Sequence, residues 1–131
     1  MPRVLAGGAF QILHPGHVEL LRRAARYGRL TVVIAHDRTV RATKGRVVVP
    51  AADRARAVAA LRFVHRVVIG HPADRLRIVR RLRPDVIVLG PDQRMPGLAA
   101  LCAEQGCRIV RVKRYRSYRT RRLAARLSRT R

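Results

Sequence analysis

The sequence predicts an α/β fold, in the form of a single Rossmann-like doubly wound domain built on a five-stranded parallel sheet. Two observations favour this class. Five short apolar runs rich in β-branched residues recur along the chain without alternating with polar residues, which is typical of strands buried on both faces of a parallel sheet. Segments with helical spacing separate these runs, so that strand and helix alternate in right-handed βαβ units.

The elements are expected in a regular order. Strands are predicted at residues 4–6, 30–35, 67–69, 86–89 and 109–112. Helices are predicted around the apolar residues within 18–25, 57–61, 76–82 and 98–102. Residues 38–50 carry four basic residues and a glycine and are expected to form a longer connection, of the kind that often covers a substrate. A basic C-terminal helix is expected from about residue 118, with a narrow apolar stripe.

Length and composition indicate a folded protein with a very basic surface. The chain has 131 residues, a net charge of +23 and 48% hydrophobic residues. A chain of this length can bury one complete core, so residues 1–131 are expected to form one domain. It contains no apolar run of about 18 residues and no long apolar segment at its N-terminus. We therefore expect a cytoplasmic protein that makes no membrane contact.

Neither the excess of arginine over lysine nor the spacing of the two cysteines identifies a function. Lys44 and Lys113 are the only lysines among 30 basic residues, a bias towards arginine that fits an unusual genome or a hot habitat as well as a function. Cys102 and Cys107 have a spacing that fits neither a disulfide scaffold nor a C-x-x-C zinc or redox site. The two cysteines are predicted to be buried thiols.

The segment after the first strand, Gly7–His17, is the most informative part of the chain. Ligands of doubly wound sheets bind beyond the carboxyl ends of the strands, and glycines there let backbone amides approach a phosphate. His14 and His17 frame the start of the first helix and could donate hydrogen bonds to phosphoryl oxygens. The alternative is that one histidine caps the helix and the other packs. A zinc site is not predicted, because no third ligand is placed.

The residues from Gly8 to His17 resemble the G-x-F-D-x-x-H-x-G-H signature of the cytidylyltransferase-like nucleotidyltransferases. Segments 37–40, 44–46, 50–54 and 84–93 resemble the archaeal-type FAD synthases, which are FMN adenylyltransferases. The glycerol-3-phosphate cytidylyltransferases are their nearest relatives. The resemblance extends over about residues 3–112 in order and spacing, and it implies the nucleotidyltransferase fold.

This resemblance implies that the phosphate of FMN attacks the α-phosphorus of ATP (or CTP) directly, so that FAD and pyrophosphate form without a covalent intermediate. Positioning and positive charge do most of the catalysis in such transfers, and Mg²⁺ accompanies the triphosphate. A homodimer is also implied. The catalytic residues implied are His14, His17 and Lys44. The nucleotide-binding residues implied are Gly8, Ala9, Phe10, Gln11, His14, His17, Asp92, Arg119 and Thr120. Asp37 and Arg54 are expected to bind substrate.

Several of these residues have simpler interpretations. Lys44 could be a solvated loop residue, and Asp37 could turn the chain where its strand ends. Two positions depart from the family pattern. Gln11 replaces the usual aspartate, and Arg119-Thr120-Arg121 replaces a cluster of hydroxyl residues, of which only Thr120 keeps the hydroxyl. The two arginines could instead hold phosphate oxygens.

Two other functions stay open. One is cytidylyl transfer to glycerol 3-phosphate or a similar small phosphorylated alcohol. The other is nonspecific nucleic-acid binding on the same fold, with catalysis weakened by Gln11. Tyr115 and Tyr118, interleaved with arginines, would allow base stacking in that case, and binding would depend steeply on salt.

Overall fold

A computed structural model describes residues 1–116 of the chain. The five predicted strands are all present and form one parallel sheet in the order β3-β2-β1-β4-β5. Arg119, Thr120 and the basic helix expected from about residue 118 lie outside the described residues. The elements are, in chain order, β1 Arg3–Gly8, α1 Pro15–Ala25, β2 Arg29–Ile34, α2 Asp37–Lys44, α3 Ala51–Ala59, β3 Arg66–Ile69, α4 Arg77–Leu82, β4 Val86–Leu89, α5 Leu98–Gln105 and β5 Arg108–Arg111.

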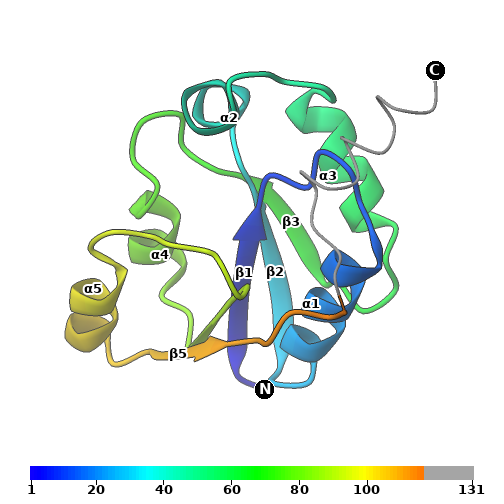
Figure 1. Cartoon of the computed structure of the whole chain (residues 1–131). Helices are drawn as coiled ribbons and strands as arrows, with labels where there is room; N and C mark the ends of the chain where they lie inside the picture. Colours follow the sequence, from blue (N-terminus) through cyan, green and yellow to red (C-terminus); the bar gives the residue numbers. More distant parts are fainter. Residues whose placement is uncertain (117–131) are drawn as a thin grey trace.

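Helices cover both faces of the sheet, as the continuous apolar strands predicted. Figure 1 shows the sheet nearly edge-on, with α1 and α3 on its right and α4 and α5 on its left. Successive strand residues point to opposite faces, so Val4 packs against α1 whereas Leu5 belongs to the cluster beneath α4 and α5. Val88 and Ile87 divide in the same way. The fold is therefore a three-layer α/β/α domain with one apolar cluster on each side.

The first helix of the described chain begins where the sequence places it. Pro15 occupies the first helical position, where the missing N–H of proline costs nothing, and His14 is the N-cap. Leu20, Leu21 and Ala24 form the buried face of α1 against β1 and β2. Leu21 and Ala24 are among the apolar residues at helical spacing from which the sequence predicted this helix.

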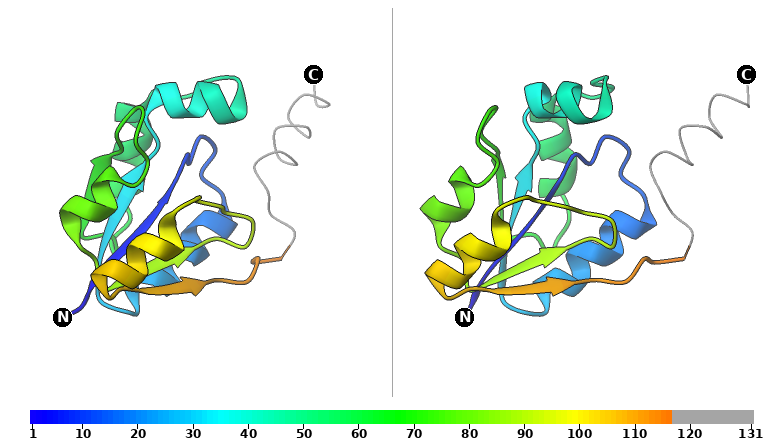
Figure 2. Two further views of the ribbon diagram at one scale, coloured as in Figure 1. Left: turned by 90° about the vertical axis from the view of Figure 1, so that its left-hand side faces the viewer. Right: turned by 60° about the vertical axis from the view of Figure 1, so that its left-hand side comes forward.

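The prediction of a connection without regular structure at 38–50 was wrong in its first half, because residues Asp37–Lys44 form helix α2. The ring of His36 caps this helix by accepting the backbone N–H of Arg38, and Gly45 ends it in a left-handed conformation with φ of 80°. Val40 is its one buried residue, so α2 offers no repeated set of core residues by which the sequence marks a helix. Figure 2 shows α2 beyond the carboxyl ends of β1 and β2, across from the loop that follows β1.

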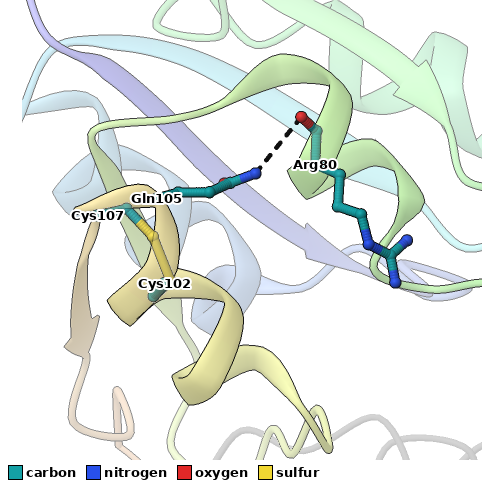
Figure 3. Close-up of a disulfide and its surroundings, with 4 residues drawn as sticks. All are labelled: Arg80, Cys102, Gln105 and Cys107. Atoms are coloured by element: carbon teal, nitrogen blue, oxygen red, sulfur yellow. Dashed lines mark hydrogen bonds between the residues drawn. A yellow bond between two sulfur atoms is a disulfide. The ribbon is translucent and has the colours of Figure 1, made fainter.

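The prediction of free thiols was also wrong, because Cys102 and Cys107 are joined by a disulfide (Figure 3). Gly106 ends α5 in the left-handed conformation, with φ of 75°, and turns the chain back over the last helical turn. The backbone N–H of Cys107 then donates to the carbonyl of Cys102 at 2.9 Å, and the two Cα atoms lie 4.8 Å apart. The predicted burial of Cys102 is confirmed, since it is 3% exposed.

None of the helices in residues 1–116 is both long and apolar enough to cross a membrane.

Candidate active site

A cleft of about 560 Å³ lies at the carboxyl ends of β1, β2 and β4. The direction in which strands are added to the sheet reverses at β1 and β4, so the cleft occupies the topological switch point of the sheet, where doubly wound folds bind their ligands. Its walls come from the loop after β1, the start of α1, helix α2, and the segments after β3, β4 and β5. The polar side chains that line it include His14, His17, His36, Thr39, Thr43, Lys44, His71, Arg75, Asp92, Gln93, Lys113, Arg114 and Tyr115.

The two histidines of the signature form a reciprocal cap on α1. The Nδ1 atom of His14 accepts the backbone N–H of Gly16 at 3.1 Å, and Nδ1 of His17 accepts the backbone N–H of His14 at 3.4 Å. The rings stack with their centroids 3.7 Å apart. Both histidines therefore take part in capping, and both also line the cleft. The two interpretations weighed from the sequence, cap and phosphate ligand, are compatible.

This arrangement sets the protonation of both rings. Burial is the main cause that lowers the pKa of His17 to about 4, and the neighbouring His14 lowers it further, while a hydrogen bond to the backbone of Ile12 acts in the opposite direction. Burial also lowers the pKa of His14. At neutral pH the rings are neutral, and since Nδ1 of each accepts a backbone N–H, the ring proton resides on Nε2. A neutral imidazole N–H is a hydrogen-bond donor suited to a phosphoryl oxygen.

Close packing beneath the histidines explains the Gly-x-Phe part of the signature. Phe10 adopts φ of 53° and buries its ring, which meets His17 edge-on at 5.1 Å between centroids. A Cβ atom on Gly8 would lie 3.1 Å from the Phe10 ring, and one on Gly7 would lie 3.1 Å from the carbonyl oxygen of Val33. A side chain at either position would crowd the Phe10 ring or the backbone of β2, which favours glycine there.

Arg54 and Asp37, which were expected to bind substrate, bind each other and do not line the cleft. The Arg54 side chain is completely buried, and its Nη2 lies 2.6 Å from Oδ1 of Asp37. The guanidinium also donates to the carbonyls of Ala9 and Val49, each at 2.7 Å. Arg54 thus ties the loop after β1 to the segment before α3.

Asp37 completes this arrangement from the first turn of α2. Its Oδ1 accepts the backbone N–H of Ala51 at 2.9 Å as well as the Arg54 contact. Removal from water acts to raise the pKa of Asp37, but the hydrogen bonds from Arg54 and Ala51 outweigh it and lower the pKa overall. The carboxylate is accordingly ionised at neutral pH and serves to hold Arg54.

Gln11 is also turned away from the cleft. Its amide Nε2 donates to the carbonyl of Arg46 at 3.1 Å, and its Oε1 accepts the backbone N–H of Val48 at 2.5 Å. Lys44 and Asp92, in contrast, line the cleft as expected. Lys44 is the last residue of α2, and the exposed carboxylate of Asp92 forms an ion pair with Arg114.

Residues after β4 and β5 also contribute to the site. Gln93 donates from Nε2 to the carbonyl of Gly7 at 2.8 Å and accepts the N–H of Gly90 at Oε1, which joins the ends of β1 and β4. Arg111 donates to the carbonyls of Gly90 and Gln93, each at 2.8 Å. Lys113, Arg114 and Tyr115 follow β5, so the rule about strand ends would have located them had it been applied to the last strand.

Comparisons with known proteins identify the family of the chain. The sequence model of the family described as cytidylyltransferase-like matches residues 5–119. A FAD synthase from Methanopyrus kandleri is 50% identical over 95 residues, which are 70% of this chain and 63% of that protein. A FAD synthase from Pyrococcus horikoshii is 51% identical over 94 residues, again 70% of this chain and 64% of the relative. The matched stretch therefore spans less than two thirds of these two relatives.

Two further proteins match over more of their length. A FAD synthase from Aciduliprofundum boonei is 42% identical over 120 residues, which are 88% of this chain and 80% of that protein. Among solved structures, a lipopolysaccharide core biosynthesis protein from Thermoplasma volcanium superimposes with a TM-score of 0.79 and 34% identity, covering 88% of this chain and 98% of the other.

Proposed function

The chain belongs to the cytidylyltransferase-like family, and from this premise we propose that it is an FMN adenylyltransferase that makes FAD and pyrophosphate from FMN and ATP. The observation that carries the proposal is the pair of neutral histidines, His14 and His17, stacked at the start of α1 on the wall of the cleft. Three relatives that are 42–51% identical are FAD synthases, which favours FMN as the acceptor.

The proposed reaction is a direct displacement. A phosphate oxygen of FMN attacks the α-phosphorus of ATP, a new P–O bond forms, and the bond from the α-phosphorus to the bridging oxygen breaks as pyrophosphate leaves. His14 and His17 donate hydrogen bonds to the α-phosphoryl oxygens, where charge builds up in the transition state, and Lys44 adds positive charge from the end of α2. The loop from Gly8 to Phe10 forms the floor under the nucleotide.

Mg²⁺ is proposed to enter with the triphosphate. Within residues 1–116 no three His, Cys, Asp or Glu side chains gather so that they could hold a metal ion on their own. A cation in the cleft would accordingly be held mainly by phosphate oxygens, with Asp92 as one carboxylate on the cleft wall. Bound there, Mg²⁺ would shield the charge of the leaving pyrophosphate.

The composition of the cleft supports a flat aromatic acceptor. Val33, Ile78, Val79, Leu89 and Met95 contribute to its lining. These apolar groups suit the rings of a flavin better than the small polar skeleton of glycerol 3-phosphate. The donor nucleotide would then occupy the part of the cleft near α1 and Asp92.

The decisive experiment gives the purified chain, with Mg²⁺, each combination of two donors and two acceptors. ATP and CTP are the donors, FMN and glycerol 3-phosphate are the acceptors, and products are resolved by chromatography. FAD from ATP and FMN alone is the expected result. CDP-glycerol from CTP would replace the proposal with the cytidylyltransferase alternative, and no product from folded protein would favour the nucleic-acid-binding alternative.

A homodimer, a cytoplasmic location and nucleic-acid binding by the basic surface stay predictions. Light scattering tests the first, and the salt dependence of RNA retention tests the last. Nonspecific binding through arginine would weaken steeply between about 50 and 200 mM salt.

A further inference from the structure

Gln11 connects two segments of the site that are far apart in the sequence. It lies in the loop between β1 and α1, three residues before His14, and its amide bonds to Arg46 and Val48 in the segment between α2 and α3. The bonded residues are separated by 35 positions in the first contact and by 37 in the second. Through them the loop that carries the histidine pair is fastened to the segment that follows Lys44.

The chemistry of these contacts requires an amide. Nε2 of Gln11 donates to a carbonyl while Oε1 accepts an N–H, so the side chain pairs with two main-chain groups of opposite polarity. A carboxylate at this position, as in the family signature, could accept from the N–H of Val48 but could not donate to the carbonyl of Arg46. The departure from the signature is thus matched to the backbone that it contacts.

We propose that Gln11 is a positioning residue, which fastens residues 46–48 to the loop after β1 and thereby fixes Lys44 relative to His14 and His17. Arg54 and Asp37 hold the far end of the same segment, at Val49 and Ala51. Of these side-chain contacts, the two made by Gln11 are nearest in the chain to Lys44 and to Gly45, where α2 ends. The effect of Gln11 on catalysis rests on the proposed function, whereas its attachment of residues 46–48 to the loop after β1 does not.

The fastening can be measured without any enzyme assay, because Lys44 and Lys113 are the only lysines. A lysine-specific endoprotease therefore has one cleavage site beside the fastened segment and one internal reference site. In Gln11→Met and Gln11→Glu, cleavage after Lys44 should rise about three- to tenfold relative to cleavage after Lys113, since one or both hydrogen bonds are lost. An unchanged ratio in both variants would overturn the proposal, whether or not the protein makes FAD.

The link to catalysis is tested by a double-mutant cycle. If Gln11 acts through Lys44, Gln11→Met should lower kcat for FAD formation about tenfold in the wild-type background but about twofold or less in Lys44→Ala. Equal fold-losses in the two backgrounds would overturn the positioning role and indicate a direct contact with nucleotide. Gln11→Glu, which keeps the shape and the acceptor atom, replaces Gln11→Met in the cycle if the methionine variant does not fold.

Discussion

The imidazole rings of His14 and His17 stack at 3.7 Å, and each ring accepts a main-chain N–H at the start of α1. One pair of side chains therefore caps the start of the helix and also lines the cleft. Capping needs only the Nδ1 atoms, whereas the proposed catalysis needs the Nε2 protons. The two roles can be separated by substitution.

The substitution His14→Asn should preserve the stability of the fold but lower the turnover of FAD formation. Asparagine is a good N-cap, so His14→Asn should keep most of the free energy of unfolding, whereas His14→Ala should lose about 1 kcal/mol with the cap. Both variants should lower kcat for FAD formation by about 100-fold or more, because neither supplies the imidazole donor. Urea unfolding and a turnover assay on the same preparations check this. Full activity in the asparagine variant would show that His14 only caps.

The stability of the fold should fall in mild acid because of His17. Its pKa is about 4 in the folded protein against an ordinary value of 6.5, so between these pH values the unfolded chain binds a proton that the folded chain does not. The free energy of unfolding should therefore decrease as the pH falls from about 7 to 4, with His17 contributing up to about 3 kcal/mol. Urea unfolding across this range measures the slope. In His17→Gln the slope should become shallower, and an identical slope would contradict the assignment to this residue.

Arg54 should be a residue of the fold rather than of the substrate pocket. Arg54→Met keeps much of the side-chain volume but removes the pair with Asp37 and the bonds to Ala9 and Val49. We expect the free energy of unfolding to fall by about 2–4 kcal/mol, measured with urea. Arg56, exposed on the same helix, provides the control: Arg56→Met should change it by less than about 0.5 kcal/mol. Equal effects of the two substitutions would be evidence against this role.

The disulfide should stabilise the fold without affecting catalysis. It closes a short loop at the end of α5, beside the amino end of β5 and away from the cleft at the carboxyl ends of the strands. A loop of this size corresponds to a stabilisation of about 2 kcal/mol in the chain-entropy estimate. Cys102→Ala/Cys107→Ala should lower the free energy of unfolding by about that amount and leave kcat and KM for FAD formation within about twofold of the wild type. A large loss of turnover in a double variant that is still folded would show that catalysis depends on the disulfide.

The sequence predicted those parts of the structure that depend on local pattern. Every strand was located because parallel strands buried on both faces are continuous apolar runs, and α1 was located because Val18, Leu21, Ala24 and Ala25 have helical spacing. Helix α2 was missed because Val40 alone is buried, and the disulfide was missed because it depends on the turn made by Gly106.

The site was predictable to the extent that it lies in one segment. The loop from Gly8 to His17 contains its own signature, so the histidines and glycines could be placed before the fold was known. The functions of Gln11 and Arg54 depend on carbonyls 35 to 45 residues away, and no local pattern specifies such contacts. Both were expected to bind ligand, and both instead hold the loops that surround the cleft.

The most direct test of the central claim is the product formed from FMN, ATP and Mg²⁺ by the full chain, measured beside His17→Gln. We expect FAD and pyrophosphate in equal amounts from the wild type, and a rate of FAD formation at least about 100-fold lower from His17→Gln that is still folded. Absence of FAD from the wild type, or formation of FAD by the variant at the wild-type rate, would contradict the proposed reaction.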